Sequence, residues 1–268
     1  MVMTAPLGWL QKNKQTFYPP LPSRLSQAID NIGYGTLEKV FVTFPRAFWL
    51  NDRGEPADPQ FKGGFTQWLS PLYAEDTNPR RWNQENVDLA TLPGPCAHPT
   101  LLYYIYGDQS VTLSSDLAGL SEKDRQDYLT KFFQPYFSLL PNYVENSKDC
   151  IPATCLATNW TADELAGYGS YTTFRTGLEE GDKDIEIMRE GLPGRGLWFA
   201  GEAMSPFVAL GTTTGAYWSG EAVGRRIAEA YEMTGSGTGS PHEVDDIVSS
   251  DGAKEINVRG FGDMGLDK

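Results

Sequence analysis

The sequence predicts a mixed α/β fold, and three observations support this prediction. Two largely apolar segments, residues 36–44 and 100–107, have the length and composition of strands. Residues 23–31 and 121–133 carry the features of helices. The strongest signal is a strand, a glycine turn and a helix in succession over residues 197–231. The chain has 268 residues, 40% of them hydrophobic, so one large domain or two modest ones can bury a core.

The first element is expected to be a strand, because residues 1–5 (MVMTA) are strand-like from the first position. A chain that starts inside a strand suggests that an upstream segment is missing. Residues 23–31 follow as a helix, with Ser23 as its candidate N-cap and Gly33 as its stop.

The segment 36–44 (TLEKVFVTF) alternates as a strand. One face carries Leu37, Lys39, Phe41 and Thr43, and the other carries Val40, Val42 and Phe44. Both faces are largely apolar, so we expect this strand to be buried on both sides. Lys39 is the anomaly, because a buried lysine must find partners or lose its charge. A buried water would serve as such a partner. The alternative is an edge-strand lysine whose ammonium reaches solvent.

The middle of the chain is expected to contain a long loop followed by a strand and a helix. Residues 50–99 are rich in Pro, Gly, Asn and Asp and predict a long irregular binding loop. Residues 100–107 predict a strand, and 121–133 a helix capped by Ser121 with Asp124 three residues on. Pro135 should end or bend that helix.

The unit over residues 197–231 offers a place for a ligand. A helix N-terminus presents unpaired N–H groups and a partial positive charge, which suit an electron-rich ligand edge. Small residues in the turn would let a flat ring approach the backbone, namely Gly211, Thr212, Thr213, Thr214 and Gly215. Gly220 and Gly224 would permit a close approach of the helix to a sheet or ligand. The alternative is an ordinary strand–helix unit with a threonine cap.

Charge and composition exclude several classes of function. The formal net charge of -13 argues against binding to a phosphate backbone or an anionic membrane surface. No apolar run approaches a membrane span, and no signal peptide is visible, so we expect a cytoplasmic protein. The three cysteines and two histidines fit no familiar zinc spacing, so no metal is expected.

Several stretches together resemble the flavin-containing amine oxidase family, which includes polyamine and monoamine oxidases. The strongest is FAGEA followed by TTTGAYWSG (199–203 and 212–220), which is similar to the family's C-terminal flavin motif. Residues 4–10, 19–49 and 159–174 resemble further family stretches in the family's order. The resemblance covers residues 1–232 and implies the C-terminal part of a two-domain FAD-dependent fold, without its N-terminal Rossmann βαβ unit. GFGDMG (260–265) has the letters of a dinucleotide motif, but no helix can follow it, so we attribute it to chance.

The resemblance implies roles for particular residues. Lys39 matches the family lysine that holds a water near flavin N5. Trp160 and Tyr171 match a substrate-site tryptophan and aromatic residue, and Thr212 stands where some members have an aromatic cage residue. The flavin contacts are implied for Gly201, Glu202, Gly211, Thr213, Thr214 and Ala216. Ser170 stands where some members have a flavin-linked cysteine, so the implied FAD is non-covalent.

The implied organisation has four parts. Residues 1–18 would belong to the FAD domain, 19–155 to a substrate domain, 156–232 to the FAD domain again, and 233–268 to a disordered tail. The implied reaction oxidises a polyamine or monoamine to an imine and then an aldehyde, with dioxygen reduced to hydrogen peroxide. A separate N-terminal FAD-binding piece is one implied partner. The alternatives are an L-amino-acid oxidase and a non-catalytic ligand-binding fragment.

Overall fold

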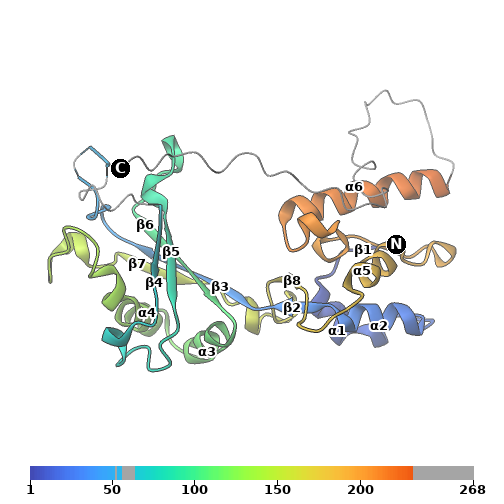
Figure 1. The fold of residues 1–268 in the computed structure, drawn as a ribbon, viewed down its shortest axis with the longest axis horizontal. Coiled ribbons are helices and arrows are strands. Elements are labelled where there is room, and N and C mark those ends of the chain that lie inside the picture. The colour runs from blue at the N-terminus through green and yellow to red at the C-terminus, as the bar shows by residue number, and fades with distance from the viewer. Residues whose placement is uncertain (52, 56–63, 232–268) are drawn as a thin grey trace, which may run out of the picture.

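The computed structural model describes residues 1–51, 53–55 and 64–231, and they form two lobes (Figure 1). The sheet lobe contains a five-stranded sheet with two long helices. The helical lobe contains both short two-stranded sheets and the remaining helices. Strand β3 (Leu37–Thr43) leads from one lobe into the other. No helix in the described part of the chain combines the length and hydropathy that a membrane crossing requires.

The sheet lobe is built on one antiparallel sheet in the order β4-β5-β6-β3-β7. Its other strands are β4 (Phe65–Trp68), β5 (Gln84–Asp88), β6 (Thr100–Tyr106) and β7 (Thr154–Ala157). The central pair β3 and β6 places Lys39 opposite Tyr104. Helices α3 (Asp108–Leu117) and α4 (Glu122–Phe137) pack against the sheet.

The prediction that β3 is buried on both faces is wrong. Burial alternates strictly along the strand, with positions 38, 40 and 42 buried and 37, 39, 41 and 43 only partly so. Val40 and Val42 join the aromatic core with Phe44 and Phe133. The other face stays partly open, because the helices of this lobe contribute to the core on one side of the sheet. We call this partly exposed face, which carries Leu37, Lys39, Phe41 and Thr43 of β3, the open face.

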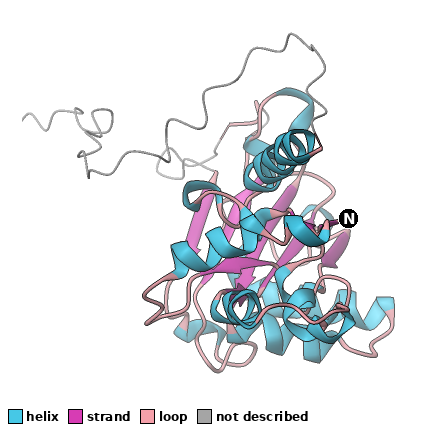
Figure 2. Cartoon of the chain, turned by 90° about the vertical axis from the view of Figure 1, so that its right-hand side faces the viewer, coloured by secondary structure: helices cyan, strands magenta, loops and turns pink. Residues whose placement is uncertain are grey.

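The helical lobe is held together by short elements (Figure 2). Strands β1 (Val2–Met3) and β9 (Trp198–Phe199) pair in parallel, and β2 (Gly33–Gly35) pairs antiparallel with β8 (Tyr171–Thr173). The helices are α1 (Leu7–Lys12), α2 (Ser23–Asn31), α5 (Gly181–Glu190) and α6 (Thr213–Ala230). Apolar side chains of α1, α2, α5 and β9 share one core.

Several predicted elements are confirmed at close to their predicted bounds. Helix α2 covers residues 23–31, although Pro22 is its N-cap and Ser23 makes no side-chain cap. Ser121 caps α4 by accepting a hydrogen bond from the Asp124 amide at 3.2 Å. Helix α6 begins after Thr212, as predicted.

Other predictions are wrong. Residues 50–99 are not wholly irregular, because they contain β4 and β5. Of the two effects predicted for Pro135, the end of the helix is wrong, because α4 continues to Phe137. A proline removes one helix hydrogen bond, whereas Tyr136 and Phe137 are buried in the core. No described neighbour outside helix α6 lies within 4 Å of the position where a Cβ of Gly220 or Gly224 would stand, so the predicted approach to a sheet is wrong, and the approach to a ligand stays a prediction. The predicted tail and the GFGDMG stretch lie outside the described residues.

Candidate functional site

Lys39 lies on the open face of the sheet. Its ammonium nitrogen lies 5.8 Å from the ring centroid of Tyr104, its cross-strand partner. A cation over an aromatic face is attracted by the ring's negative quadrupole. The side chain is half-buried, so the structure gives Lys39 an aromatic partner and leaves its three donors directed at a partly open surface.

Trp160 lies at the start of a short turn, η6 (Trp160–Ala162), which follows β7. Its side chain is 45% exposed and lines an open pocket of about 490 Å³ together with Leu156, Thr158 and Asp163. The Trp160 amide donates to the carboxylate of Glu38 at 3.1 Å. Because Glu38 is the neighbour of Lys39 in β3, this bond ties the tryptophan turn to the strand that carries the lysine.

Tyr171 lies opposite Gly35 in the β2–β8 pair. The preceding residue, Ser170, bonds the backbone of Leu37 twice, with its hydroxyl donating to the Leu37 carbonyl at 2.7 Å and accepting from the Leu37 amide at 3.0 Å. Leu37 is the first residue of β3. The segment carrying Tyr171 is therefore anchored to the same strand as Lys39.

Glu202 connects Tyr171 to the glycine turn before α6. Its carboxylate accepts from the Thr172 hydroxyl at 2.6 Å and from the Gly211 amide at 2.9 Å. Burial raises the pKa of this carboxyl group, and the hydrogen bonds from Thr172 and Gly211 act in the opposite direction. Gly211 has a φ of 74°, and a side chain there would stand 3.2 Å from the Tyr171 ring, so only glycine fits.

The N-terminus of α6 is open to solvent. Thr212 caps it, with the hydroxyl accepting from the Gly215 amide at 2.9 Å. Thr213 and Thr214 are exposed, and Ala216 is half-buried. Gly215 packs so closely against the Ala209 carbonyl that an added Cβ would lie 2.1 Å from that oxygen. This packing fixes the direction of the helix end against the turn.

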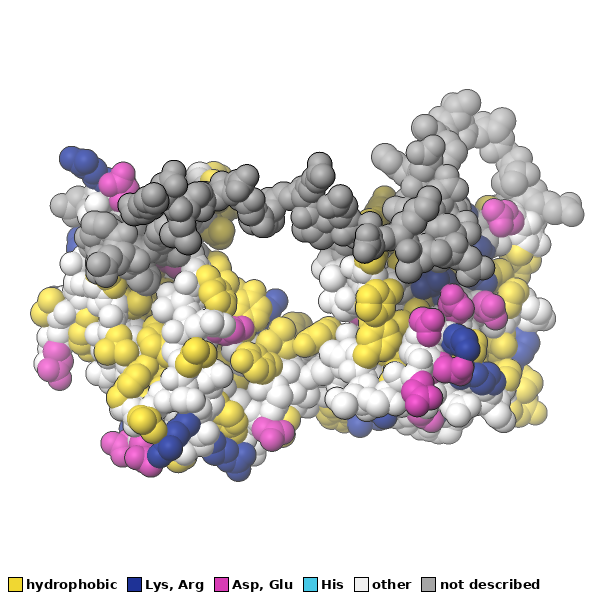
Figure 3. Space-filling view, in the orientation of Figure 1, with side chains coloured by type: hydrophobic (Ala, Val, Ile, Leu, Met, Phe, Trp, Pro, Cys, Tyr) yellow, Lys and Arg dark blue, Asp and Glu magenta, His cyan; other side chains and the backbone are white. Residues whose placement is uncertain are grey.

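These contacts join most of the predicted residues into one chain across the junction of the lobes. It runs from Thr212 and Gly211 through Tyr171 to the start of β3, and from there to Lys39 and Trp160. Thr213, Thr214 and Ala216 lie beyond this chain, on the first turn of α6. Figure 3 shows a hollow between the two lobes with apolar side chains on both of its walls.

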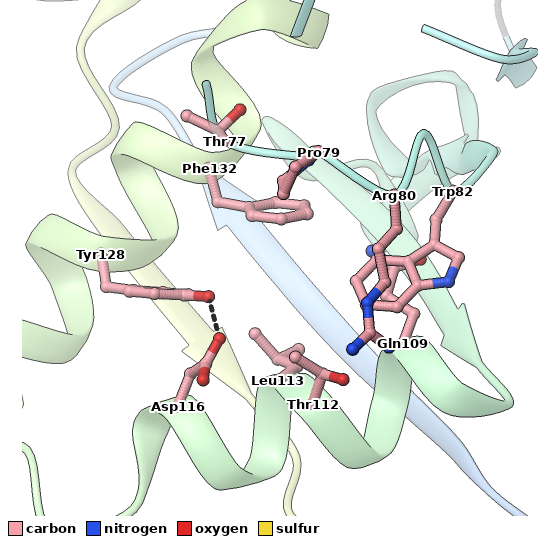
Figure 4. A pocket seen from close by; sticks show the side chains of 10 residues that line it. All are labelled: Thr77, Pro79, Arg80, Trp82, Gln109, Thr112, Leu113, Asp116, Tyr128 and Phe132. Atoms are coloured by element: carbon pink, nitrogen blue, oxygen red, sulfur yellow. Dashed lines mark hydrogen bonds between the residues drawn. The ribbon is translucent and has the colours of Figure 1, made fainter. Parts of the chain in front are cut away.

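A second pocket lies away from these residues, between α3, α4 and residues 77–82 (Figure 4). Its volume is about 130 Å³, and none of the predicted site residues lines it. Tyr128 donates to Asp116 across it at 2.7 Å, and burial raises the pKa of Tyr128. Arg80 stacks over Trp82, with 5.1 Å from guanidinium carbon to ring centroid. Among the described residues, no group of three or more His, Cys, Asp or Glu side chains is arranged to hold a metal ion.

The residues of the helical lobe fit part of a flavin nucleotide. Gly201 has a φ of 143° and nothing within 4 Å of the position where a Cβ would stand, which leaves room for a ligand beside it. Its amide donates to the Ser219 hydroxyl at 3.1 Å, so this glycine offers space rather than a free donor. The exposed first turn of α6 adds N–H donors and a partial positive charge. The carboxylate of Glu202 accepts hydrogen bonds from Thr172 and Gly211 and so holds the glycine turn, while its predicted contact with a flavin stays a prediction.

Glu38 is the residue that the sequence-based prediction missed. It is fully buried, at 0% exposure, and accepts three hydrogen bonds around the Trp160 turn. Its place on the buried face, in alternation with Val40 and Val42, is the signal that could have identified it. A carboxylate at a core position requires several donors.

Comparison with known proteins adds the family context. The family model described as flavin containing amine oxidoreductase matches residues 1–228. The human peroxisomal N(1)-acetyl-spermine/spermidine oxidase is 30% identical over 82% of this chain and 40% of its own length. A lysine-specific histone demethylase 1 homolog from Oryza sativa subsp. japonica is 26% identical over 96% of this chain and 26% of its own length. The chain thus spans less than half the length of these curated relatives.

Solved structures show the same fold. A cyclohexylamine oxidase from Brevibacterium oxydans superposes with a TM-score of 0.57 at 21% identity, covering 86% of this chain and 43% of its own. A redesigned putrescine oxidase superposes with a TM-score of 0.53 at 15% identity, covering 85% and 42%. These superpositions correspond to a partial domain of the larger enzymes.

Proposed function

Because this chain belongs to the flavin-containing amine oxidoreductase family, whose cofactor is FAD, we propose that it forms the amine-binding part of an FAD-dependent amine oxidase. The net reaction converts an amine, water and dioxygen to an aldehyde, the released nitrogen compound and hydrogen peroxide. The observation that carries the proposal is that the segments bearing Trp160 and Tyr171 are both hydrogen-bonded to β3, the strand of Lys39, through Glu38 and Leu37 respectively.

When bound, FAD supplies the acceptor for the hydride that leaves the carbon next to the amine nitrogen. The exposed first turn of α6, at Thr213 and Thr214, would hold it through backbone N–H groups, and Gly201 would leave it room because no side chain stands there. We propose non-covalent binding, because Ser170 offers no thiol and its hydroxyl is engaged with Leu37. Acid precipitation should then release all flavin, and flavin retained in the pellet would contradict this assignment.

The chain's own residues would orient the amine. Trp160 and Tyr171 offer aromatic surface to the carbon skeleton of the substrate, and their turns are fixed by Glu38, Ser170 and Glu202. Lys39 holds its ammonium on the open face, where it can donate to an ordered water. The relatives suggest polyamines or related aliphatic amines as the substrate class.

The test is a peroxide assay on the protein that contains this chain, loaded with FAD. Spermine, N1-acetylspermine, putrescine and benzylamine are offered as amines, with an L-amino acid as the comparison. Peroxide formed with at least one amine, and lost on heat denaturation, supports the proposal. Folded, FAD-loaded protein that is inactive with all amines would overturn it, and activity restricted to the amino acid would favour an L-amino-acid oxidase.

A second candidate is a non-catalytic ligand-binding fragment. The specific observation in its favour is that the chain spans 40% of the length of the human relative. If the rest of the FAD site lies in another segment, the purified chain should hold FAD weakly or not at all. Stoichiometric yellow flavin that survives gel filtration of this chain would show that the cofactor site is sufficient by itself.

A further inference from the structure

Glu38 has no place in the proposed chemistry, yet it is among the most buried polar side chains of the sheet lobe, at 0% exposure. It precedes Lys39 in β3, and successive side chains of a strand point to opposite faces. Lys39 therefore lies on the open face, and Glu38 lies on the buried face. Strand β3 thus carries a candidate catalytic cation, Lys39, and a buried carboxylate, Glu38, at consecutive positions on opposite faces.

The carboxylate is compensated by hydrogen bonds rather than by an opposite charge. Its Oε2 accepts from the Thr158 hydroxyl at 2.5 Å and from the Trp160 amide at 3.1 Å. Its Oε1 accepts from the Thr161 amide at 2.7 Å. None of the ion pairs formed by the described residues includes Glu38. A carboxylate that accepts backbone N–H groups makes strong, charge-assisted bonds with defined geometry.

The donors all belong to the segment that carries Trp160. Thr158 also binds the backbone of Lys39 in both directions, with its amide donating to the Lys39 carbonyl at 2.9 Å and its hydroxyl accepting from the Lys39 amide at 2.8 Å. Ser114 of α3 holds the adjacent Asn159 by a side-chain hydrogen bond. The turn is thereby fixed on one side to the strand and on the other to a helix.

We propose that Glu38 is a positioning residue that holds the Trp160 turn in register with Lys39. The catalytic relevance of this arrangement rests on the proposed function, whereas the structural role of Glu38 does not depend on it. The backbone N–H of Trp160 donates a hydrogen bond to Glu38. The carboxylate therefore fixes the backbone position from which the indole side chain extends. Without it, two adjacent amides lose their acceptor, and the turn has no other described bond that ties it directly to a β3 side chain.

The first experiment measures solvent exchange of backbone amides by NMR in this chain, comparing wild type with Glu38→Gln. Glutamine keeps the size but only one acceptor oxygen, so it cannot serve Trp160 and Thr161 as the carboxylate does. We expect the exchange of at least one of these two amides to accelerate by roughly tenfold, as expected when a hydrogen bond is lost. Amides of the β3–β6 ladder should keep their wild-type exchange.

Glu85→Gln is the matched control, because Glu85 lies on β5 of the same sheet and, among the described residues, its side chain bonds only that of Gln67, at 3.1 Å. It should leave the Trp160 and Thr161 amides unchanged. Wild-type exchange of both amides in Glu38→Gln would overturn the proposal. An equal acceleration throughout the sheet would also overturn it, because that result indicates a general stabilising role. Glu38→Ala removes both acceptor oxygens and should have a larger effect on the same two amides. If this variant does not fold, the test of the proposal rests on Glu38→Gln.

The second experiment separates positioning from bulk stability in the FAD-loaded protein that contains this chain. A displaced substrate-site tryptophan should raise KM about tenfold in Glu38→Gln while kcat stays within about twofold, the pattern of lost ground-state binding. Unchanged KM would contradict the proposal. If the wild type oxidises no amine, the proposed function fails, and the amide exchange still decides whether Glu38 holds the turn.

Discussion

The two lobes are stabilised in different ways. The sheet lobe buries one contiguous apolar cluster, in which Phe44, Phe48, Trp49 and Phe137 meet edge to face at centroid distances of 5.1–5.6 Å. The helical lobe has strands of only two or three residues, so many of its backbone groups lie outside regular pairing. Long arginine side chains bind those carbonyls instead.

Two arginines illustrate the difference. Arg189 of α5 donates to the carbonyls of Met204 and Ser205, both at 2.9 Å, and so holds the turn before α6. Arg226 of α6 donates to the carbonyls of Arg189 and Glu190. The sheet lobe should therefore be most sensitive to cavities, and the helical lobe to the loss of donors.

The largest effect is expected from Phe133→Ala in the sheet lobe. Phe133 is fully buried, and its ring centroid lies 4.2 Å from that of Tyr103. Removal of a buried phenylalanine side chain typically costs about 3–5 kcal/mol, because transfer energy is lost and a cavity remains. Denaturant unfolding followed by circular dichroism, with exchange measured separately in each lobe, should show the loss in the sheet lobe.

Phe65→Ala is the matched control for that prediction. Phe65 lies on β4 of the same sheet but is 55% exposed, so its removal should cost well under about 1 kcal/mol. Equal losses from the two substitutions would show that the sheet lobe is not stabilised mainly by its core.

Arg189→Met should weaken the helical lobe by roughly 2–3 kcal/mol, because it leaves two carbonyls without their charged donor. Burial lowers the pKa of the Arg189 guanidinium, in keeping with its half-buried place between α5 and the turn. Amide exchange in α5 and α6 should accelerate while the β3–β6 ladder keeps its protection. Arg225→Met is the control, since the ion pair that Arg225 forms within the described part of the chain is with the exposed Glu221, at 3.5 Å. Identical behaviour of the two variants would remove the argument that carbonyl binding stabilises this lobe.

Much of the fold could be predicted from sequence where apolar periodicity and capping agree. Strands β3 and β6 and helices α2, α4 and α6 have those signals. Strand β5 (QENVD) was missed because its buried face is polar, with Gln84 and Asn86 in the core. Alternation of hydrophobicity cannot identify a strand whose inward side chains are polar.

The site was predictable only in part. Lys39, Trp160 and Tyr171 were identified through a family resemblance, and their roles remain predictions. The alternation in β3 places Glu38 on the buried face, but its hydrogen-bond donors lie about 120 positions further along the chain, where no local pattern could identify them. Ser170 lies 133 positions from Leu37, so long-range side-chain bonds are what the sequence alone could not provide.

Lys39→Met tests whether the open face of the sheet lobe is catalytic. Methionine keeps the unbranched stem and removes the ammonium, so folding and FAD content should stay nearly unchanged. In the FAD-loaded protein, flavin reduction by amine or reoxidation by dioxygen should slow by at least ~10-fold, about 1.4 kcal/mol on the barrier. Stopped-flow absorbance separates these two half-reactions.

Lys12→Met is the matched control, because Lys12 also lies over a tyrosine, with 5.1 Å from its nitrogen to the Tyr168 centroid, but on helix α1. It should leave both half-reactions unchanged. If both rates in Lys39→Met equal those of the wild type while FAD stays bound, Lys39 is structural and the lysine–tyrosine contacts of the two lobes are equivalent.

The smallest effect concerns pH and compares one carboxylate from each lobe, Glu202 and Asp88. Burial raises the pKa of Glu202 above its ordinary value of 4.5 and that of Asp88 above 3.8, while hydrogen bonds to each oppose the shift. A raised folded-state pKa means that the folded protein binds more protons than the unfolded chain within that window, so stability falls as pH rises through it. The contribution is fully present below the ordinary pKa and is lost above the folded-state pKa. Amide exchange measured at increasing pH from pH 4 should therefore show that the helical lobe of the wild type loses stability, and Glu202→Gln should abolish this loss. Asp88→Asn should abolish the corresponding loss in the sheet lobe and leave that of the helical lobe unchanged. A decline that persists in Glu202→Gln would assign the pH dependence of the helical lobe to other groups.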